Sequence, residues 1–170
     1  HPERLQSLTL MSTVPASTEY KQQTDSIVQG RLTQEDLLER SNLVKSAAFR
    51  NGEPQAMADF FRLSFRSVLH DRTMVDQIPL ELPDNFGESS KKLGNLFEDL
   101  EQIDLYPRLP AITCPALVVH GAADAVPLAA VERIAQTIPD SQLEVFSESG
   151  HFPYIEQPQA FQELMARFLP

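Results

Sequence analysis

The sequence predicts an α/β fold in which parallel strands carry flanking helices and a long helical segment follows the first strand. From residue 109 onward, short apolar segments alternate with segments of helical periodicity, which is the pattern of parallel strands joined by right-handed crossovers. Residues 18–108 show helical spacing with mixed polarity instead. We therefore divide the chain into residues 1–17, 18–108 and 109–170, namely the first strand, a helical segment and the rest of the α/β core.

The first strand and the first helix are predicted from local patterns. Residues 5–11 alternate between apolar and polar side chains and then become apolar, which indicates a strand. Thr33 and Asp36 resemble a capping box at the start of a helix. Apolar positions at helical spacing continue to residue 48, and Gly52 is the predicted C-cap.

Two further helices are predicted in the helical segment. Pro54 begins the first of them, and its apolar stripe consists of Met57, Phe60, Phe61, Ser64, Phe65 and Val68. We interpret this stripe as packing core rather than a substrate pocket. Prolines and a glycine interrupt the spacing over residues 78–88, which are predicted to be a loop. The second helix is expected over residues 89–101.

The last segment contains two predicted strands and two predicted helices. Residues 115–120 are almost continuously apolar, as expected of a parallel strand covered on both faces. A helix over residues 127–138 and a strand over residues 142–146 follow, and an amphipathic helix over residues 158–169 comes last. Each strand is therefore followed by a loop at its carboxyl end.

Composition excludes several classes of function. The chain has 14 basic and 24 acidic residues and a net charge of −10, which argues against nucleic acid and membranes as partners because both favour Lys and Arg. The single cysteine, Cys114, excludes an internal disulfide and a cysteine-based zinc site. No apolar run approaches the roughly 18 residues that a membrane span needs. We expect a cytoplasmic protein that needs neither a metal nor a cofactor.

Two reactive side chains follow neighbouring strands of the predicted sheet. Asp124 lies in the loop after residues 115–120, and His151 lies in the loop after residues 142–146. In open α/β sheets such loops meet at the carboxyl edge, where ligands bind. A carboxylate there can accept the proton of one imidazole nitrogen and leave the other free as a general base. The alternative interpretation is an Asx-turn at Asp124 and a structural histidine at position 151.

The sequence blocks around these two residues resemble the C-terminal part of the α/β-hydrolase fold family. The first block is ITCPALVVHGAADAVP at residues 112–127, the second is SGHFPYIEQP at residues 149–158, and the opening HPERL resembles the turn before the family's sixth strand. The resemblance implies about three parallel strands with flanking helices, plus a helical cap formed by residues 18–108. It also implies Asp124 as the triad acid and His151 as the triad base.

The same family carries its nucleophile on a G-x-S-x-G elbow that precedes the acid and the base in the chain. None of the six glycines begins such an elbow. We therefore expect a C-terminal fragment, the cap plus the last three strands, that is inactive alone. The strand at residues 5–11 would lack the neighbour that the family places beside it, which predicts self-association through the sheet edge.

Within the family, the chain most resembles proline iminopeptidase-like hydrolases. The motifs that carry this likeness are NGEP at residues 51–54, FFRLSFR at 60–66 and IDLYPRL at 103–109. The resemblance implies a parent serine hydrolase that releases N-terminal proline or cleaves small amides or esters. An acidic cap residue would suit the free amine of such a substrate, and Glu53, Asp59 and Asp71 are candidates by composition.

Two alternatives remain open at this point. The parent enzyme could belong to the esterase, epoxide hydrolase or dehalogenase branch of the fold, since the residue that serves as nucleophile is missing. Outside enzymes, the chain could be a non-catalytic binding or assembly module. Three further side chains are interpreted as structural: His120 in packing, Cys114 as a small buried hydrophobe, and His70 at the surface.

Overall fold

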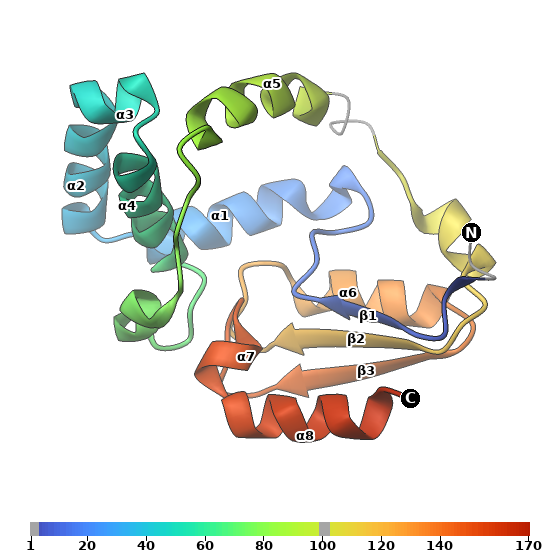
Figure 1. Ribbon diagram of the computed structural model, residues 1–170. Helices are drawn as coiled ribbons and strands as arrows, with labels where there is room; N and C mark the ends of the chain where they lie inside the picture. Colours follow the sequence, from blue (N-terminus) through green and yellow to red (C-terminus); the bar gives the residue numbers. More distant parts are fainter. Residues whose placement is uncertain (1–3, 99–102) are drawn as a thin grey trace.

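The computed structural model describes residues 4–98 and 103–170. Its centre is a three-stranded sheet in the order β1 (Leu8–Met11), β2 (Ala116–Gly121) and β3 (Ser141–Phe146). Both strand pairs are parallel, and Val118 lies between Leu10 and Leu143. The helical segment between β1 and β2 lies beyond the sheet (Figure 1). The predicted α/β class is confirmed, although β1 begins at Leu8 rather than at residue 5.

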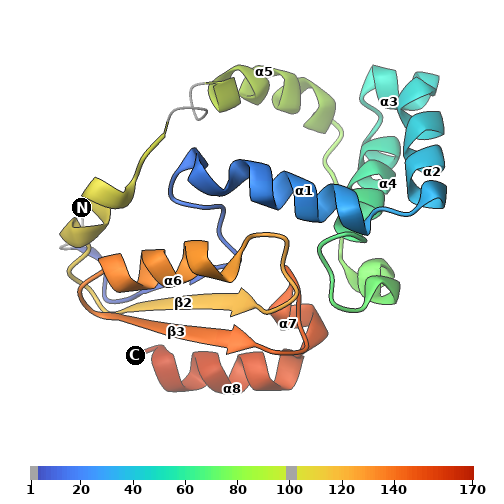
Figure 2. The same ribbon diagram turned by 180° about the vertical axis from the view of Figure 1, so that it is seen from behind.

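Helices cover both faces of this sheet. α6 (Leu128–Thr137) lies on one face and α8 (Pro158–Phe168) on the other (Figures 1 and 2). Alternate residues of β2 serve the two faces, because Val118 joins the apolar cluster under α6 whereas Leu117 and Val119 join the cluster under α8. Every residue of β2 is buried. The near-continuous apolar run at residues 115–120 is thus explained by burial on two sides.

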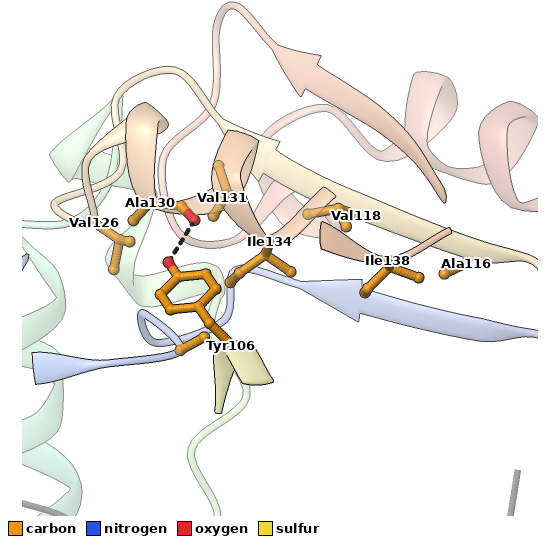
Figure 3. Packing of buried hydrophobic residues seen from close by; sticks show 9 residues of the cluster. Tyr106, Ala116, Val118, Val126, Ala130, Val131, Ile134 and Ile138 are labelled. Atoms are coloured by element: carbon orange, nitrogen blue, oxygen red, sulfur yellow. Dashed lines mark hydrogen bonds between the residues drawn. The ribbon is translucent and has the colours of Figure 1, made fainter. Parts of the chain in front are cut away.

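The apolar cluster under α6 also contacts the segment through which the chain returns from the helical insertion to the sheet. This segment is the 3-10 helix η5 (Tyr106–Ala111). The Tyr106 ring packs beside Val126 and Ile134, and its hydroxyl donates a hydrogen bond to the carbonyl of Ala130 at 3.4 Å (Figure 3). On another side, the guanidinium of Arg133 lies 3.8 Å from the centre of the same ring. The tyrosine therefore buries its ring and still has a partner for its hydroxyl.

The inserted helical segment forms the cap. In chain order its elements are η2 (Thr18–Tyr20), α1 (Lys21–Arg31), α2 (Gln34–Lys45), α3 (Ala47–Asn51), α4 (Pro54–Phe65), η3 (Arg72–Gln77) and α5 (Phe86–Glu98). The chain leaves the core and returns to it at one place. Ser17 forms an antiparallel bridge with Asp104, and the amide of Leu105 donates to the carbonyl of Ala16 at 2.8 Å.

Several helix boundaries in the cap are those that local residues predict. The Thr33 hydroxyl accepts a hydrogen bond from the amide of Asp36 (3.1 Å), and the Asp36 carboxylate accepts one from the amide of Thr33 (2.8 Å). This is the predicted capping box. Gly52 ends α3 with a φ of 75°, a left-handed conformation that glycine adopts without steric cost. Pro54 begins α4.

The first of the predicted cap helices, α2, is shorter than predicted. Apolar spacing suggested one helix that continues to residue 48, but α2 ends at Lys45 because Ser46 adopts an extended conformation with ψ of 152°. The Ser46 hydroxyl then accepts a hydrogen bond from the amide of Phe49 (3.1 Å) and caps α3. A serine favours helix starts through this side-chain contact, and here it separates two helices.

The predicted C-terminal boundary of the loop over residues 78–88 is also wrong. Helix α5 begins at Phe86 and includes Gly87, which was interpreted as a helix breaker. The glycine has a packing reason instead, because a Cβ at position 87 would lie 2.7 Å from the carbonyl oxygen of Gly52. The predicted helix residues 99–101 lie outside the described residues.

The polar centre of the cap is Asp36, which is only 2% exposed. Its carboxylate accepts hydrogen bonds from Arg72 (2.6 and 2.8 Å) and Arg66 (3.1 Å) in addition to Thr33. Burial acts to raise the pKa of Asp36, but the hydrogen bonds from Thr33, Arg72 and Arg66 together hold it well below its usual range. One carboxylate thus joins α2 to the segment after α4 and to η3.

Candidate active site

Asp124 is positioned by the loop that leaves β2. Its amide donates to the carbonyl of Gly121 (2.9 Å), which folds the chain back immediately after the strand. One carboxylate oxygen, Oδ1, accepts a hydrogen bond from the amide of Val126 (3.1 Å). This is the Asx-turn that we considered as an alternative interpretation. It leaves the second oxygen of a residue that is only 5% exposed available for another partner.

That partner is His151, in the loop after β3. Its Nδ1 lies 2.8 Å from Oδ2 of Asp124, so the structure brings the two predicted site residues together. Because a carboxylate is an acceptor, Nδ1 carries the proton, and Nε2 is the nitrogen with a free lone pair. The His151 side chain is 32% exposed, whereas that of Asp124 is almost completely buried. The imidazole of His151 can therefore be reached from outside while the carboxylate of Asp124 cannot.

Close backbone packing sets the relative position of the two loops. The amide of Ala123 donates to the carbonyl of Ser149 (2.9 Å), next to both site residues. A Cβ at Gly121 would lie 2.0 Å from the carbonyl oxygen of Gly150. Only glycine at position 121 permits this approach, and the approach places the loop of Asp124 against the loop of His151.

His120 lies next to Asp124 and contributes to the same loop. It is buried, and its Nε2 donates to the carbonyl of Val126 at 3.0 Å. Its Nδ1 has no hydrogen-bond partner among the described residues and lies 3.9 Å from Oδ2 of Asp124. Burial lowers the pKa of His120 although the nearby Asp124 carboxylate acts to raise it, so the ring is neutral at pH 7. The interpretation of His120 as a packing residue is supported.

A series of contacting phenylalanine rings connects His151 to the cap. The Phe152 ring lies 5.1 Å from the His151 ring and 5.0 Å from Phe65. Phe65 stacks on Phe61, and Phe61 contacts Phe86 at the start of α5. These rings are half-buried, whereas the buried residues of α4 are Ala56, Ala58 and Leu63. The predicted stripe is thus only partly packing core, and through Phe65 it reaches Phe152, the neighbour of His151.

The three acidic cap candidates do not contact His151. Glu53 is exposed in front of α4. The Asp59 carboxylate binds Gln55 and Arg62 on its own helix. The Asp71 carboxylate accepts hydrogen bonds from the hydroxyl and the amide of Thr73, which lower its pKa. Among the described residues, none of the three therefore makes a contact that would place it next to His151 as a partner for a substrate amine.

Metal-ligand groups, membrane-spanning helices, Cys114 and His70 concern the rest of the described chain. Within residues 4–98 and 103–170, no three His, Cys, Asp or Glu side chains are grouped as metal ligands. Cys114 is buried without a disulfide partner, as expected of a small hydrophobe. None of the described helices combines the length and the apolar character needed to cross a bilayer. His70 is exposed, as predicted.

Contacts that no sequence pattern predicted join the cap to both loops. Arg31, the last residue of α1, donates to the carbonyl of Ala123 beside Asp124 and to that of Ser67 (3.3 Å). The amide of His151 donates to the carbonyl of Val68 (2.8 Å). Glu156, the last residue of α7 (Pro153–Glu156), accepts hydrogen bonds from both regions. Only Glu156 had a signal, its place in the second sequence block.

Comparisons with known proteins agree with this architecture. A proline iminopeptidase of Heyndrickxia coagulans is 35% identical over 77 residues, 45% of this chain and 25% of that protein. A pimeloyl-[acyl-carrier protein] methyl ester esterase of Aromatoleum aromaticum is 38% identical over 68 residues, 39% of this chain and 27% of the esterase. The structure of an alpha/beta fold family hydrolase from Bacillus anthracis superposes with a TM-score of 0.69 at 19% identity.

The last superposition covers 98% of this chain and 59% of the Bacillus anthracis hydrolase, so the chain spans well under two thirds of the relatives it matches. The family described as the alpha/beta hydrolase fold matches residues 1–158. That match includes β1, the cap, and the loops of Asp124 and His151. On this evidence the chain belongs to the α/β-hydrolase fold family.

Proposed function

We propose that Asp124 and His151 are the acid and the base of a hydrolytic triad, and that the protein carrying them hydrolyses small carboxylic esters or amides, with prolyl amides first among the substrates. One observation carries the proposal. A nearly buried carboxylate accepts a hydrogen bond of 2.8 Å from one nitrogen of an accessible imidazole and leaves the other nitrogen free. Asp and His combine in this way in the acid–base half of a nucleophilic triad.

In the proposed reaction, Nε2 of His151 takes the proton of a hydroxyl nucleophile as its oxygen attacks the substrate carbonyl carbon. The imidazolium then gives that proton to the leaving amine or alcohol, and an acyl-enzyme remains. Water, deprotonated by His151, hydrolyses this ester and regenerates the hydroxyl. Asp124 keeps the proton on Nδ1 and stabilises the imidazolium at each step. The sequence contains no G-x-S-x-G elbow, so we propose that the nucleophile lies outside these 170 residues.

The substrate class rests on two further observations. The similarity to a proline iminopeptidase supports a prolyl amide, and the similarity to a methyl ester esterase supports a small ester. Phe152 lies beside His151, Phe65 packs against Phe152, and both rings are half-buried, which suits an apolar group next to the scissile bond.

A serine-directed fluorophosphonate probe tests the proposal. The 170-residue chain should remain unlabelled, and the longest polypeptide that its reading frame encodes should be labelled and should hydrolyse prolyl p-nitroanilide or p-nitrophenyl esters. In that longer polypeptide, His151→Asn and Asp124→Asn should each reduce kcat by about 10³-fold or more. Asp140→Asn is the matched control, because this exposed residue lies in the turn before β3 and should leave kcat unchanged.

Two outcomes would contradict the proposal. Labelling of the 170-residue chain would show that its nucleophile lies within these residues. A longer polypeptide that neither reacts with the probe nor hydrolyses any of the substrates would favour the alternative of a non-catalytic binding or assembly module.

A further inference from the structure

The carboxylate of Glu156 accepts four hydrogen bonds from two separate parts of the chain. Oε2 accepts from the amide of Gly150 (2.7 Å) and from the hydroxyl of Ser149 (3.1 Å), both directly before His151. Oε1 accepts from the amides of His70 (2.7 Å) and Asp71 (3.3 Å) in the cap. One side chain therefore joins the loop of the proposed base to the segment that follows α4.

Backbone contacts reinforce this junction. The amide of His151 donates to the carbonyl of Val68 (2.8 Å). A Cβ at Gly150 would lie 2.1 Å from the same carbonyl oxygen and 2.9 Å from the amide nitrogen of His70. The loop and the cap segment are thus in direct backbone contact, without space for an intervening side chain. His151 is thus held by two sets of contacts, one made by its own amide and one made by the two residues before it.

We propose that Glu156 is a positioning residue for His151: by binding the loop and cap residues 70–71 together, it keeps Nδ1 of His151 within hydrogen-bond distance of Asp124. An effect of this positioning on catalysis rests on the proposed function, whereas the positioning itself does not. All four partners of Glu156 are donors, so the site needs an acceptor on both sides. A carboxylate meets that need, and its charge strengthens each bond.

The substitution Glu156→Gln tests the need for a carboxylate at nearly constant volume. The amide of glutamine has one oxygen and one NH₂ group, so either the loop or the cap donors would face a donor. Glu163→Gln is the matched control. It removes the same charge from an exposed position on α8, where the carboxylate contacts only the side chain of Gln159 among the described residues.

The readout is the Nδ1 proton of His151, observed by NMR in the 170-residue chain labelled with ¹⁵N-histidine and assigned by its loss in His151→Asn. We expect Glu156→Gln to accelerate its exchange with water by about tenfold or more, since two charge-assisted hydrogen bonds are lost. Glu163→Gln should leave the exchange rate unchanged. Amide exchange in residues 67–72 and 147–152 should rise together in Glu156→Gln, because one side chain joins the two segments.

Ser149→Ala keeps the test decisive if Glu156→Gln does not fold. It removes one of the four hydrogen bonds and retains the amide of Gly150, so we expect a smaller acceleration in the same direction. An unchanged Nδ1 proton in a folded Glu156→Gln variant, or in Ser149→Ala when the glutamine variant is unfolded, would overturn the inference.

Kinetics of the longer polypeptide separate this inference from the proposed function. If the polypeptide is a hydrolase, Glu156→Gln should lower kcat by about tenfold or more at unchanged KM, whereas a fall in stability alone would lower the amount of active enzyme. Loss of activity in every form, with the Nδ1 effect still present, would contradict the proposed function and retain the positioning role.

Discussion

The C-terminal α/β core and the cap are stabilised by different means. In the core, β2 is buried along its whole length, and α6 contributes Ala130, Val131 and Ile134 to one apolar cluster. In the cap, α1 and α3 have no buried residue, and the one buried residue of α2 is the charged Asp36. The core thus depends on apolar burial, whereas α1 and α2 are anchored by the polar contacts of Arg31 and Asp36, and α3 packs its Phe49 ring against Phe60 of α4.

A similar contrast exists inside the sheet. β2 is fully buried between two strands, whereas β1 is half-buried and, among the described strands, pairs with β2 alone. A strand paired on one side leaves amide and carbonyl groups free for another chain. Self-association therefore stays a prediction, and we expect the mass measured by light scattering to rise at least to that of a dimer with concentration. A monodisperse monomer would contradict it.

The largest effect on stability should come from the glycine that lets the two site loops meet. Gly121→Ala places a Cβ 2.0 Å from the carbonyl oxygen of Gly150, which is backbone and cannot rotate away. We expect a loss of more than about 3 kcal/mol in the free energy of unfolding, or displacement of the His151 loop. Urea unfolding measures the first, and the Nδ1 proton of His151 reports the second. A variant as stable as the parent with an unchanged Nδ1 signal would show that the loops are less tightly packed.

A core substitution should cost more than a matched one in the cap. Ile134 is almost completely buried between α6 and β2, and Leu38 on α2 is 63% exposed. We expect Ile134→Ala to lower the free energy of unfolding by about 3 kcal/mol and Leu38→Ala to change it by less than about 0.5 kcal/mol. Equal losses in urea unfolding would remove the distinction between the two regions.

The cap should respond most to the loss of its buried charge. Asp36→Asn leaves Arg66 and Arg72 without their shared carboxylate, and because both arginines are partly exposed we expect a loss of about 2 kcal/mol at pH 7 rather than the larger cost of a fully buried pair. The pKa of Asp36 is lowered in the folded protein, so its contribution is complete above the unfolded pKa and is lost as the pH falls. The difference between parent and variant, measured by urea unfolding, should therefore shrink below about pH 4. A constant difference down to pH 2 would contradict the lowered pKa.

A small effect of the opposite sign is expected in α1. Gly30 lies inside α1, and a Cβ there would meet no atom within 4 Å. Since glycine disfavours helix interiors, Gly30→Ala should raise the free energy of unfolding by about 0.5–1 kcal/mol. A decrease in the midpoint of urea unfolding would show that α1 does not need its full helical length. Together with Gly121→Ala, this variant separates a glycine needed for packing from one that is not.

Predictions from the sequence succeeded where a few neighbouring residues determine the structure. The capping box of Thr33 and Asp36, the left-handed Gly52 and the buried strand at residues 115–120 all follow from local chemistry or from apolar spacing. The break at Ser46 was missed because the apolar pattern continues across it. Gly87 is predicted as a loop residue because glycine usually interrupts helices. Its close approach to Gly52, which requires a glycine at this position, involves a segment elsewhere in the chain.

The sequence by itself determined the three strands and the helices α6 and α8 in their order, and placed Asp124 and His151 after neighbouring strands, because both follow from periodicity and from the rule that parallel strands end at one edge. Tertiary structure alone decided that Nδ1 faces Asp124, that Phe65 of the cap packs against Phe152 beside His151, and that Arg31, Val68 and Glu156 join the cap to the two loops. These contacts join residues far apart in the chain, so no local pattern encodes them.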